Sequence, residues 1–269
     1  MSTGGFDLGG HLAGLIVYAM ETPEKAPAVG WFHAFMQSDG APVALSELAA
    51  THARLPAGIW KGDESPRPLM TALPIFGIRT PDGELLTEPI ELARVDWNAT
   101  DHHLTLFDGY ADRVDFLKGR STAYLAVLSD WFDPGADREV PLARLCHQYA
   151  ALFNARLYLE AYKLLEIRWM SEEPPAKGLL QGLMQVAVGL YQIETGRYAI
   201  DQLEEGYYHI RENAGAFPAP TLPRFLKRLE RAIGALKGSG PERFQSFDLE
   251  VFPRLWMKSP WKIMFGLGG

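Results

Sequence analysis

The sequence is poor in cysteine and in positive charge, and each shortage excludes a class of protein. A single cysteine, Cys146, allows no disulfide within the 269 residues and no zinc site built from several thiolates. Acidic residues outnumber basic residues 33 to 26 and give a net charge of −7. Such a balance argues against a protein that neutralises nucleic-acid phosphates, so we expect no nucleic-acid partner.

Export and membrane-spanning signals are also missing. The first basic residue is Lys25, so the chain lacks the charged beginning of a signal peptide. The apolar run Leu8–Met20 has thirteen residues, fewer than the roughly 20 that a membrane-spanning helix requires. We therefore expect a cytoplasmic protein, with the inner face of a membrane as a further location, and we expect Leu8–Met20 to lie in a core or an interface.

Motifs for phosphate, zinc or nucleophilic chemistry are absent as well. The glycines near the N-terminus do not form Gly-x-Gly-x-x-Gly, and no Gly-Lys-Ser/Thr occurs. His102 and His103 are adjacent, so on a strand they point to opposite faces and cannot easily share an ion. Cys146 and His147 diverge by roughly 100° on a helix. We expect no cofactor, no metal site and an inert thiol.

The two halves of the chain differ in charge and in pattern. Residues 1–140 contain 20 acids and 10 bases, whereas residues 141–269 contain 13 acids and 16 bases. A boundary is predicted near Asp133-Pro134-Gly135. The predicted parts are an N-terminal domain at 1–135, a helical domain at 140–238 and a C-terminal segment at 239–269.

Short apolar runs separated by turn residues predict a small antiparallel sheet in the first half. Thr80-Pro81-Asp82-Gly83 is typical of a tight turn, because proline presets φ and glycine accepts positive φ. The four expected strands are 73–79, 84–87, 90–97 and 102–107. Two short helices are expected at 45–55 and 122–132, with Ser46 and Ser121 as N-caps.

Helical periodicity dominates the second half. The expected helices are 142–153, 158–170, 179–194, 197–210 and 221–238. Gly196 is placed where a left-handed helix cap is wanted. Short turns between these helices predict antiparallel packing. The fold class is therefore α+β, a small antiparallel sheet domain followed by an all-α antiparallel helical bundle.

Two motifs in this half resemble a known family. The run 153–166, FNARLYLEAYKLLE, is followed by Trp169 and then by LQGLMQ at 180–185. This pattern is similar to domain-of-unknown-function family 309, whose pattern is approximately Phe-Asn-x-Gly-x-Tyr-Trp-Glu-Ala-His-Glu-x-Leu-Glu-x-x-Trp and then Leu-Gln-Gly-Leu-Ile-Gln. The resemblance covers roughly residues 145–235 and implies a compact helical bundle.

The departures from the family pattern concern its reactive positions. Tyr162 stands at the family's histidine, Lys163 at a glutamate, and Arg156 at a glycine, whereas Glu166 is retained. A phenol with a pKa of about 10 is a poor substitute for a neutral imidazole. We expect a structural polar network of Glu166, Gln181 and Gln185. The catalytic candidates, should the chain be an enzyme, are Glu160, Tyr162 and Glu166.

The end of the chain mixes aromatic and basic residues without an acid. Such a mixture suits a protein groove or an anionic membrane surface, and the alternative is a segment that folds back on its own core. The expected partner-binding residues are Trp256, Lys258, Trp261, Lys262 and Phe265.

A noncatalytic role is therefore favoured. We expect an accessory or assembly subunit that docks on a larger protein complex, which can be membrane-associated. One alternative is a metal-dependent or acid–base hydrolase that uses the helical-domain carboxylates. Another is a small-ligand binding module in the bundle core.

Overall fold

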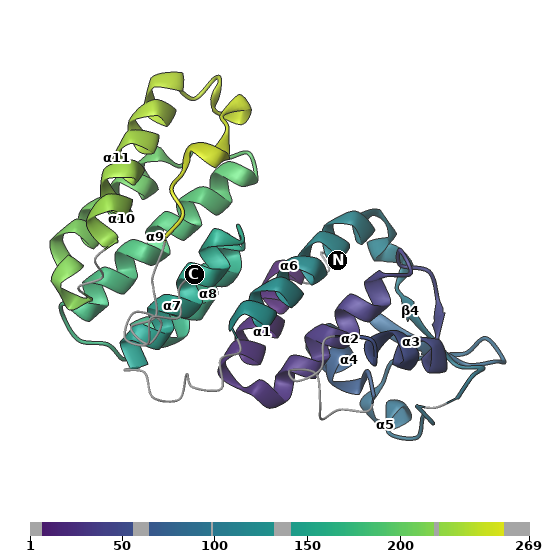
Figure 1. Cartoon of the computed structure of the whole chain (residues 1–269). Helices are drawn as coiled ribbons and strands as arrows, with labels where there is room; N and C mark the ends of the chain where they lie inside the picture. Colours follow the sequence, from purple (N-terminus) through teal and green to yellow (C-terminus); the bar gives the residue numbers. More distant parts are fainter. Residues whose placement is uncertain (1–6, 56–64, 98, 132–140, 218–220, 256–269) are drawn as a thin grey trace, which may run out of the picture. The chain divides into compact units, whose positions relative to one another are not determined.

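The chain forms two compact units in a computed structural model (Figure 1). Unit 1 comprises residues 1–133 and unit 2 comprises residues 134–269. The structure describes residues 7–55, 65–97, 99–131, 141–217 and 221–255. The boundary predicted near Asp133 lies next to this division, which also groups the C-terminal segment 239–269 with unit 2.

Unit 1 combines helices with a small sheet. Its helices are α1 (Leu8–Glu21), α2 (Ala26–Met36), α3 (Leu45–His52), α4 (Arg67–Ala72), α5 (Pro89–Leu92) and α6 (Val114–Trp131), with short 3₁₀ helices η1 (Pro23–Lys25) and η2 (Asp108–Arg113). Its strands are β1 (Val43–Ala44), β2 (Phe76–Arg79), β3 (Leu85–Leu86) and β4 (His103–Leu106).

The four strands form one antiparallel sheet in the order β1-β4-β2-β3. Ile78 on β2 pairs with Leu86 on β3 and with Leu104 on β4. The predicted turn between β2 and β3 is confirmed, because Thr80 N donates to Glu84 O at 2.9 Å and Gly83 has a φ of 86°. The sheet followed by helices confirms the predicted α+β class.

The expected strand at 90–97 is wrong. Pro89 begins the short helix α5 in its place, and the fourth strand of the sheet is β1. Proline has a φ suited to the first helical position. Glu88 and Glu91 form a capping box, in which the Glu88 side chain accepts from Glu91 N and the Glu91 side chain accepts from Glu88 N. The capping signal overrides the apolar pattern, and Ile90 is left 69% exposed.

Two expected N-caps are also wrong. Helix α3 begins at Leu45, so Ser46 lies inside it. Helix α6 begins at Val114, well before Ser121, whose hydroxyl donates to Lys118 O at 2.9 Å within the helix. A serine can form this bond to a preceding carbonyl inside a helix, so its presence alone does not locate a helix start.

The core of unit 1 lies where α2 meets the sheet and α6. The Phe35 ring contacts Phe76 of β2 edge-on at 5.1 Å, and the Phe32 ring lies 6.4 Å from the rings of both Phe76 and Tyr124. All four side chains are buried. Helix α1 also contacts α2 and α6 and buries most of its apolar residues, as expected for Leu8–Met20.

Unit 2 is the predicted helical bundle. Its helices are α7 (Pro141–Asn154), α8 (Tyr158–Trp169), α9 (Ala176–Glu194), α10 (Ile200–Asn213) and α11 (Leu222–Ser239), with short 3₁₀ helices η4 (Ala214–Ala216), η5 (Phe244–Ser246) and η6 (Leu249–Val251). Helices that follow one another from α7 to α11 pack against each other (Figure 1). Gly196 follows α9 with a φ of 85°, as expected for a left-handed cap. No helix in the described ranges is long and apolar enough to cross a membrane.

Candidate functional site

An aromatic cluster holds α7 to the rest of unit 2. The Phe153 ring lies 5.5 Å from Tyr149, 5.4 Å from Tyr158 and 6.0 Å from Phe225. Burial raises the pKa of Tyr149 well above its usual value, and its hydroxyl donates to Leu183 O at 2.7 Å. These aromatic residues therefore serve packing and do not exchange protons near neutral pH.

Asn154 joins the end of α7 to the C-terminal segment. Its Nδ2 donates to Leu255 O at 2.8 Å, and Leu255 N donates to its Oδ1 at 2.7 Å. One amide side chain therefore satisfies both backbone groups of Leu255, whose side chain is fully buried. This reciprocal pair anchors the segment on the helices of unit 2.

Arg156 stands in a strained backbone conformation beside Asn154. Its φ is 60°, in the left-handed region that costs a non-glycine residue about 1 kcal/mol. Its guanidinium forms an ion pair with Glu250 of η6. The turn between α7 and α8 is thereby tied to the C-terminal segment at a second point.

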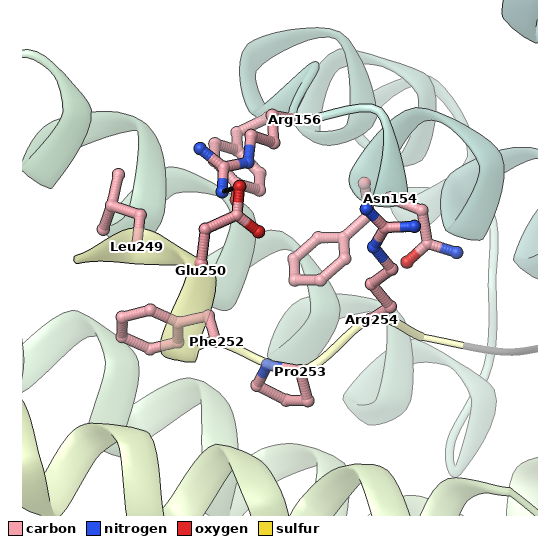
Figure 2. Close-up of a pocket in the computed structure, with 9 residues that line it drawn as sticks. Asn154, Arg156, Leu249, Glu250, Phe252, Pro253 and Arg254 are labelled. Carbon is pink, nitrogen blue, oxygen red and sulfur yellow. Dashed lines mark ion pairs between the residues drawn. The ribbon is translucent and has the colours of Figure 1, made fainter.

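A small pocket lies between this turn and the segment. Figure 2 shows Arg156 and Glu250 facing one another on one side, with Asn154 and Arg254 together on the other. The cavity has a volume of about 50 Å³. Because one water needs roughly 10–15 Å³ of such volume, the pocket has room for a few waters or a small ion, but not for a metabolite.

The retained carboxylate, Glu166, is held by neighbours on α8. Tyr162 Oη donates to its Oε1 at 2.5 Å, and Lys163 Nζ donates to its Oε2 at 2.7 Å. The bond from Lys163 and then that from Tyr162 lower the pKa of Glu166. Burial and the bond to Glu166 raise the pKa of Tyr162 to about 12. Both groups therefore have protonation states that are unsuited to proton transfer near neutral pH.

The other predicted network residues bond elsewhere. Gln185 Nε2 donates to Glu205 Oε2 of α10 at 3.0 Å, and its buried Oε1 has no hydrogen-bond partner within the described ranges. No hydrogen bond of the Gln181 side chain occurs there either. The single network of Glu166, Gln181 and Gln185 is therefore corrected: Glu166 reaches Tyr162 and Lys163 along α8, and Gln185 turns to α10.

The remaining catalytic candidate, Glu160, lies apart from Glu166. It is 2% exposed, whereas the Glu166 side chain is 38% exposed. Six residues of helix place the two carboxylates on different sides of α8. The structure therefore does not bring Glu160, Tyr162 and Glu166 together as one acid–base site.

Comparison with family models identifies this region. Residues 146–203 match the model described as Domain of unknown function (DUF309). We refer to this matched segment, residues 146–203, as the DUF309 region of the chain. The match runs from α7 into α10, so it includes Asn154, Arg156 and Glu166, and it confirms the resemblance seen in the motifs. The N-terminal half has no recognised family, and neither curated proteins nor solved structures give a match.

The departures from the DUF309 pattern have structural meanings. The pattern's glycine falls at Arg156, where the backbone has positive φ, so the family residue suits the turn better than arginine does. The pattern's histidine falls at Tyr162, which is committed to Glu166. No cluster of three metal-binding side chains occurs in the parts of the chain that the structure describes.

Cys146 of the DUF309 region is buried in α7. Burial, and after it the charge of Glu172, raises the pKa of the thiol to about 12. A thiolate is the reactive form, so this cysteine has little nucleophilic character at neutral pH.

The predicted partner-binding residues lie beyond the DUF309 region and outside the described residues: Trp256, Lys258, Trp261, Lys262 and Phe265. The part of the segment before them folds back on unit 2. Phe244 contacts Tyr198 at 5.4 Å, Phe252 contacts Phe247 at 6.1 Å, and Phe244, Phe252 and Leu255 are buried.

Removal of the Glu166 charge tests the α8 contacts. We expect Glu166→Gln to lower the free energy of unfolding at pH 7 by less than about 1 kcal/mol, because the carboxylate is partly exposed. Because the pKa of Glu166 is lower in the folded protein than in the unfolded one, its charge stabilises the folded state at pH values above the unfolded pKa. This stabilisation is lost as the pH falls through the folded-state pKa. Urea unfolding of wild type and variant should therefore differ less at pH 3 than at pH 7.

The matched control for this experiment is Glu212→Gln on α10. Glu212 is exposed and forms no hydrogen bond or ion pair within the described ranges. The free energy of unfolding of the Glu212→Gln protein should therefore change between pH 7 and pH 3 by nearly the same amount as that of wild type. If Glu166→Gln destabilised the protein equally at both pH values, the loss would not come from the charge of Glu166 in its bonds to Tyr162 and Lys163.

Helix α11 carries a basic surface that the sequence analysis did not single out. Arg224, Lys227, Arg228 and Arg231 are all exposed, and the sole acid of the helix is Glu230. Their spacing places them along one side of the helix, opposite the buried Leu229 and Ile233. The i, i+3, i+4, i+7 spacing of these cations was the signal that could have revealed the surface. We call these four residues the α11 basic face.

Proposed function

We propose that this chain is a noncatalytic accessory or assembly subunit that docks on an acidic surface of a larger protein complex through the α11 basic face. The observation that carries the proposal is the state of these four cations. All four are exposed, and none forms an ion pair within the described ranges. Exposed charge of one sign orients and accelerates association with a partner of the opposite sign.

The rest of the molecule makes this concentration of charge more notable. The chain as a whole has a net charge of −7, so the charge of the α11 basic face is opposite in sign to that of the whole chain. By contrast, Lys237, near the end of the same helix, pairs with Glu204 at 2.7 Å. The α11 basic face therefore has unneutralised charge available for a partner.

The DUF309 motif residues support a role without a reaction. Asn154 and Arg156 attach the C-terminal segment, Phe153 centres the aromatic cluster, and Glu166 is bound by Tyr162 and Lys163. Each contact stabilises the bundle. A bundle with one charged face is suited to docking on a surface of opposite charge.

The proposal extends to a complex at the inner face of a membrane. Its support is the composition of residues 256–269, which contain aromatic and basic residues without an acid. Tryptophan and cationic side chains favour the boundary between water and anionic lipid. Such a segment would add a second contact to the one made by α11.

Reversal of charge on α11 tests the docking. The variant Arg224→Glu, Arg228→Glu, Arg231→Glu should recover at least 10-fold less of a specific acidic partner than wild type in quantitative crosslinking and co-purification. The reason is that attraction becomes repulsion while the buried side of α11 is unchanged. Recovery by wild type should also fall as salt rises from 50 to 500 mM.

The matched control reverses three exposed cations elsewhere: Arg94→Glu, Arg197→Glu and Arg243→Glu. This variant has the same net charge and should retain the partner. Glu166→Gln should retain it too. Equal recovery by the two triple variants would contradict the proposal, and so would nucleic acid as the recovered material or a hydrolytic activity lost in Glu166→Gln.

A further inference from the structure

A large groove lies on unit 1. It is bounded by α1, by the η1–α2 junction and by α4, and its volume is about 770 Å³. This volume falls within the range of roughly 300–1,000 Å³ that is usual for sites of small ligands. The groove lies in the half of the chain that no family model describes.

One small residue on α1, Gly14, leaves the groove open. It lines the groove, and a Cβ built on it meets no atom within 4 Å, whereas a Cβ on Gly10 would clash with the Asp7 carboxylate. Apolar side chains form the walls, among them Leu15 of α1, Ala28 of α2 and Pro68 of α4. The groove is therefore a trough along α1 with a mainly apolar lining.

Tyr18 extends this trough by a further turn of α1. It lines the groove and is 63% exposed, although most of α1 is buried. An exposed tyrosine next to apolar walls offers contact area to a ligand at low cost in conformational entropy.

Two cationic side chains line the groove. Lys25 of η1 and Arg67 of α4 line it, both are exposed, and neither forms an ion pair with the residues that the structure describes. The one carboxylate in the lining, Asp7, caps α1 by accepting from Gly10 N at 2.9 Å. His11 Nδ1 donates to Ala72 O at 3.2 Å. The lining therefore carries two cations and one carboxylate, a net positive charge that an anionic ligand can meet.

The groove offers little to an extended peptide. Its walls are helices, whose backbone groups are bonded within each helix, and the Thr71 hydroxyl donates to Arg67 O at 3.1 Å. An extended peptide laid on these walls would find no backbone partners for its own N–H and C=O groups. An alkyl chain that ends in one anionic group has no backbone N–H or C=O groups to leave unpaired.

We propose that this groove binds an amphipathic anion, an alkyl chain that carries one carboxylate. The alkyl chain lies over Gly14, and the carboxylate reaches Lys25 and Arg67. This site is in unit 1 and uses none of the residues of the α11 basic face, so it goes beyond the proposed function and does not depend on it.

Titration of the purified full chain with defined probes tests the chemistry. Dodecanoate, kept below its micellar concentration, should bind saturably at one molecule per chain in isothermal titration calorimetry. Dodecyltrimethylammonium should bind at least 10-fold more weakly because it meets Lys25 and Arg67 with like charge. Butanoate should not bind measurably because its chain buries too little apolar surface.

Two variants test the position of the site. Gly14→Leu places a side chain in the groove without a clash in the core and should weaken dodecanoate binding at least 10-fold. Its control is Gly119→Leu on α6, where a Cβ also meets nothing within 4 Å. Lys25→Ala with Arg67→Ala should weaken binding similarly, whereas Arg54→Ala with Arg94→Ala should not. Far-UV circular dichroism checks that each variant is folded.

The contrary outcomes are distinct. Dodecanoate binding that survives Gly14→Leu, or equal binding of the cationic probe, would overturn the site. Binding to phosphatidylglycerol vesicles that is unaffected by Gly14→Leu, without saturable binding of free dodecanoate, would assign the surface to a membrane and also overturn it. The α11 charge-reversal variant should bind dodecanoate like wild type, which keeps failure here separate from failure of the proposed function.

Discussion

Gly182→Ala is expected to destabilise unit 2 by about 2–3 kcal/mol or more, although alanine is the better helix former. A Cβ at Gly182 on α9 would lie 2.6 Å from Ile210 N and 2.8 Å from Gly206 O, and both are backbone atoms of α10. Neither atom can rotate away, so the two helices must separate. Hydrogen exchange of the α9 and α10 amides, measured against urea concentration, reports this loss directly.

The reciprocal and control substitutions make the test specific. Gly206→Ala should destabilise similarly, because its Cβ would lie 2.9 Å from both Gly182 O and Val186 N. Gly234→Ala on α11 should instead stabilise by about 0.5–1 kcal/mol. Gly234 is exposed and a Cβ there meets nothing within 4 Å. A Gly182→Ala protein as stable as wild type would show that α9 and α10 do not approach this closely.

Asn154→Ala is expected to release the C-terminal segment from unit 2. The substitution removes two hydrogen bonds and leaves the N–H and C=O of the buried Leu255 without their partner. Each orphaned group costs about 1–3 kcal/mol, so the local opening free energy should fall by about 2–6 kcal/mol. Exchange of the Leu255 amide and proteolysis within residues 244–255 should both become faster.

Asn213→Ala is the matched control for this release. Asn213 Nδ2 donates to His209 O at 2.9 Å, within its own helix α10. Its loss should leave residues 244–255 as protected as in wild type. Unchanged exchange at Leu255 in the Asn154→Ala protein would mean that the two Asn154 hydrogen bonds do not hold the segment.

Sequence patterns predicted most elements of the fold because their signals are local. Alternation and a turn at Thr80–Gly83 located two strands, and 3.6-residue periodicity located the helices of unit 2. The segment 90–97 failed because two signals competed there. The capping interactions of Glu88 and Glu91 with Pro89 satisfy backbone groups locally, whereas its apolar residues found no place in the sheet.

The candidate site was predictable only in part. The matched motif contained Asn154 without assigning it a role, Arg156 was noted as a departure from the pattern, and Glu166 was expected to be structurally bonded. Nothing in the spacing indicated that Asn154 reaches Leu255, which is 101 residues away, or that Arg156 pairs with Glu250. Contacts of this range depend on how the segment after α11 returns to α7.

The sequence by itself determined the fold class, the DUF309 resemblance and the replacement of the family's histidine by Tyr162, since periodicity and motif order survive without coordinates. Tertiary structure alone decided which distant groups come together: Asn154 with Leu255, Gln185 with Glu205, and Lys25 and Arg67 in the lining of one groove. The physical reason is that side-chain direction and helix packing set distances of a few ångströms, and a linear pattern does not contain them.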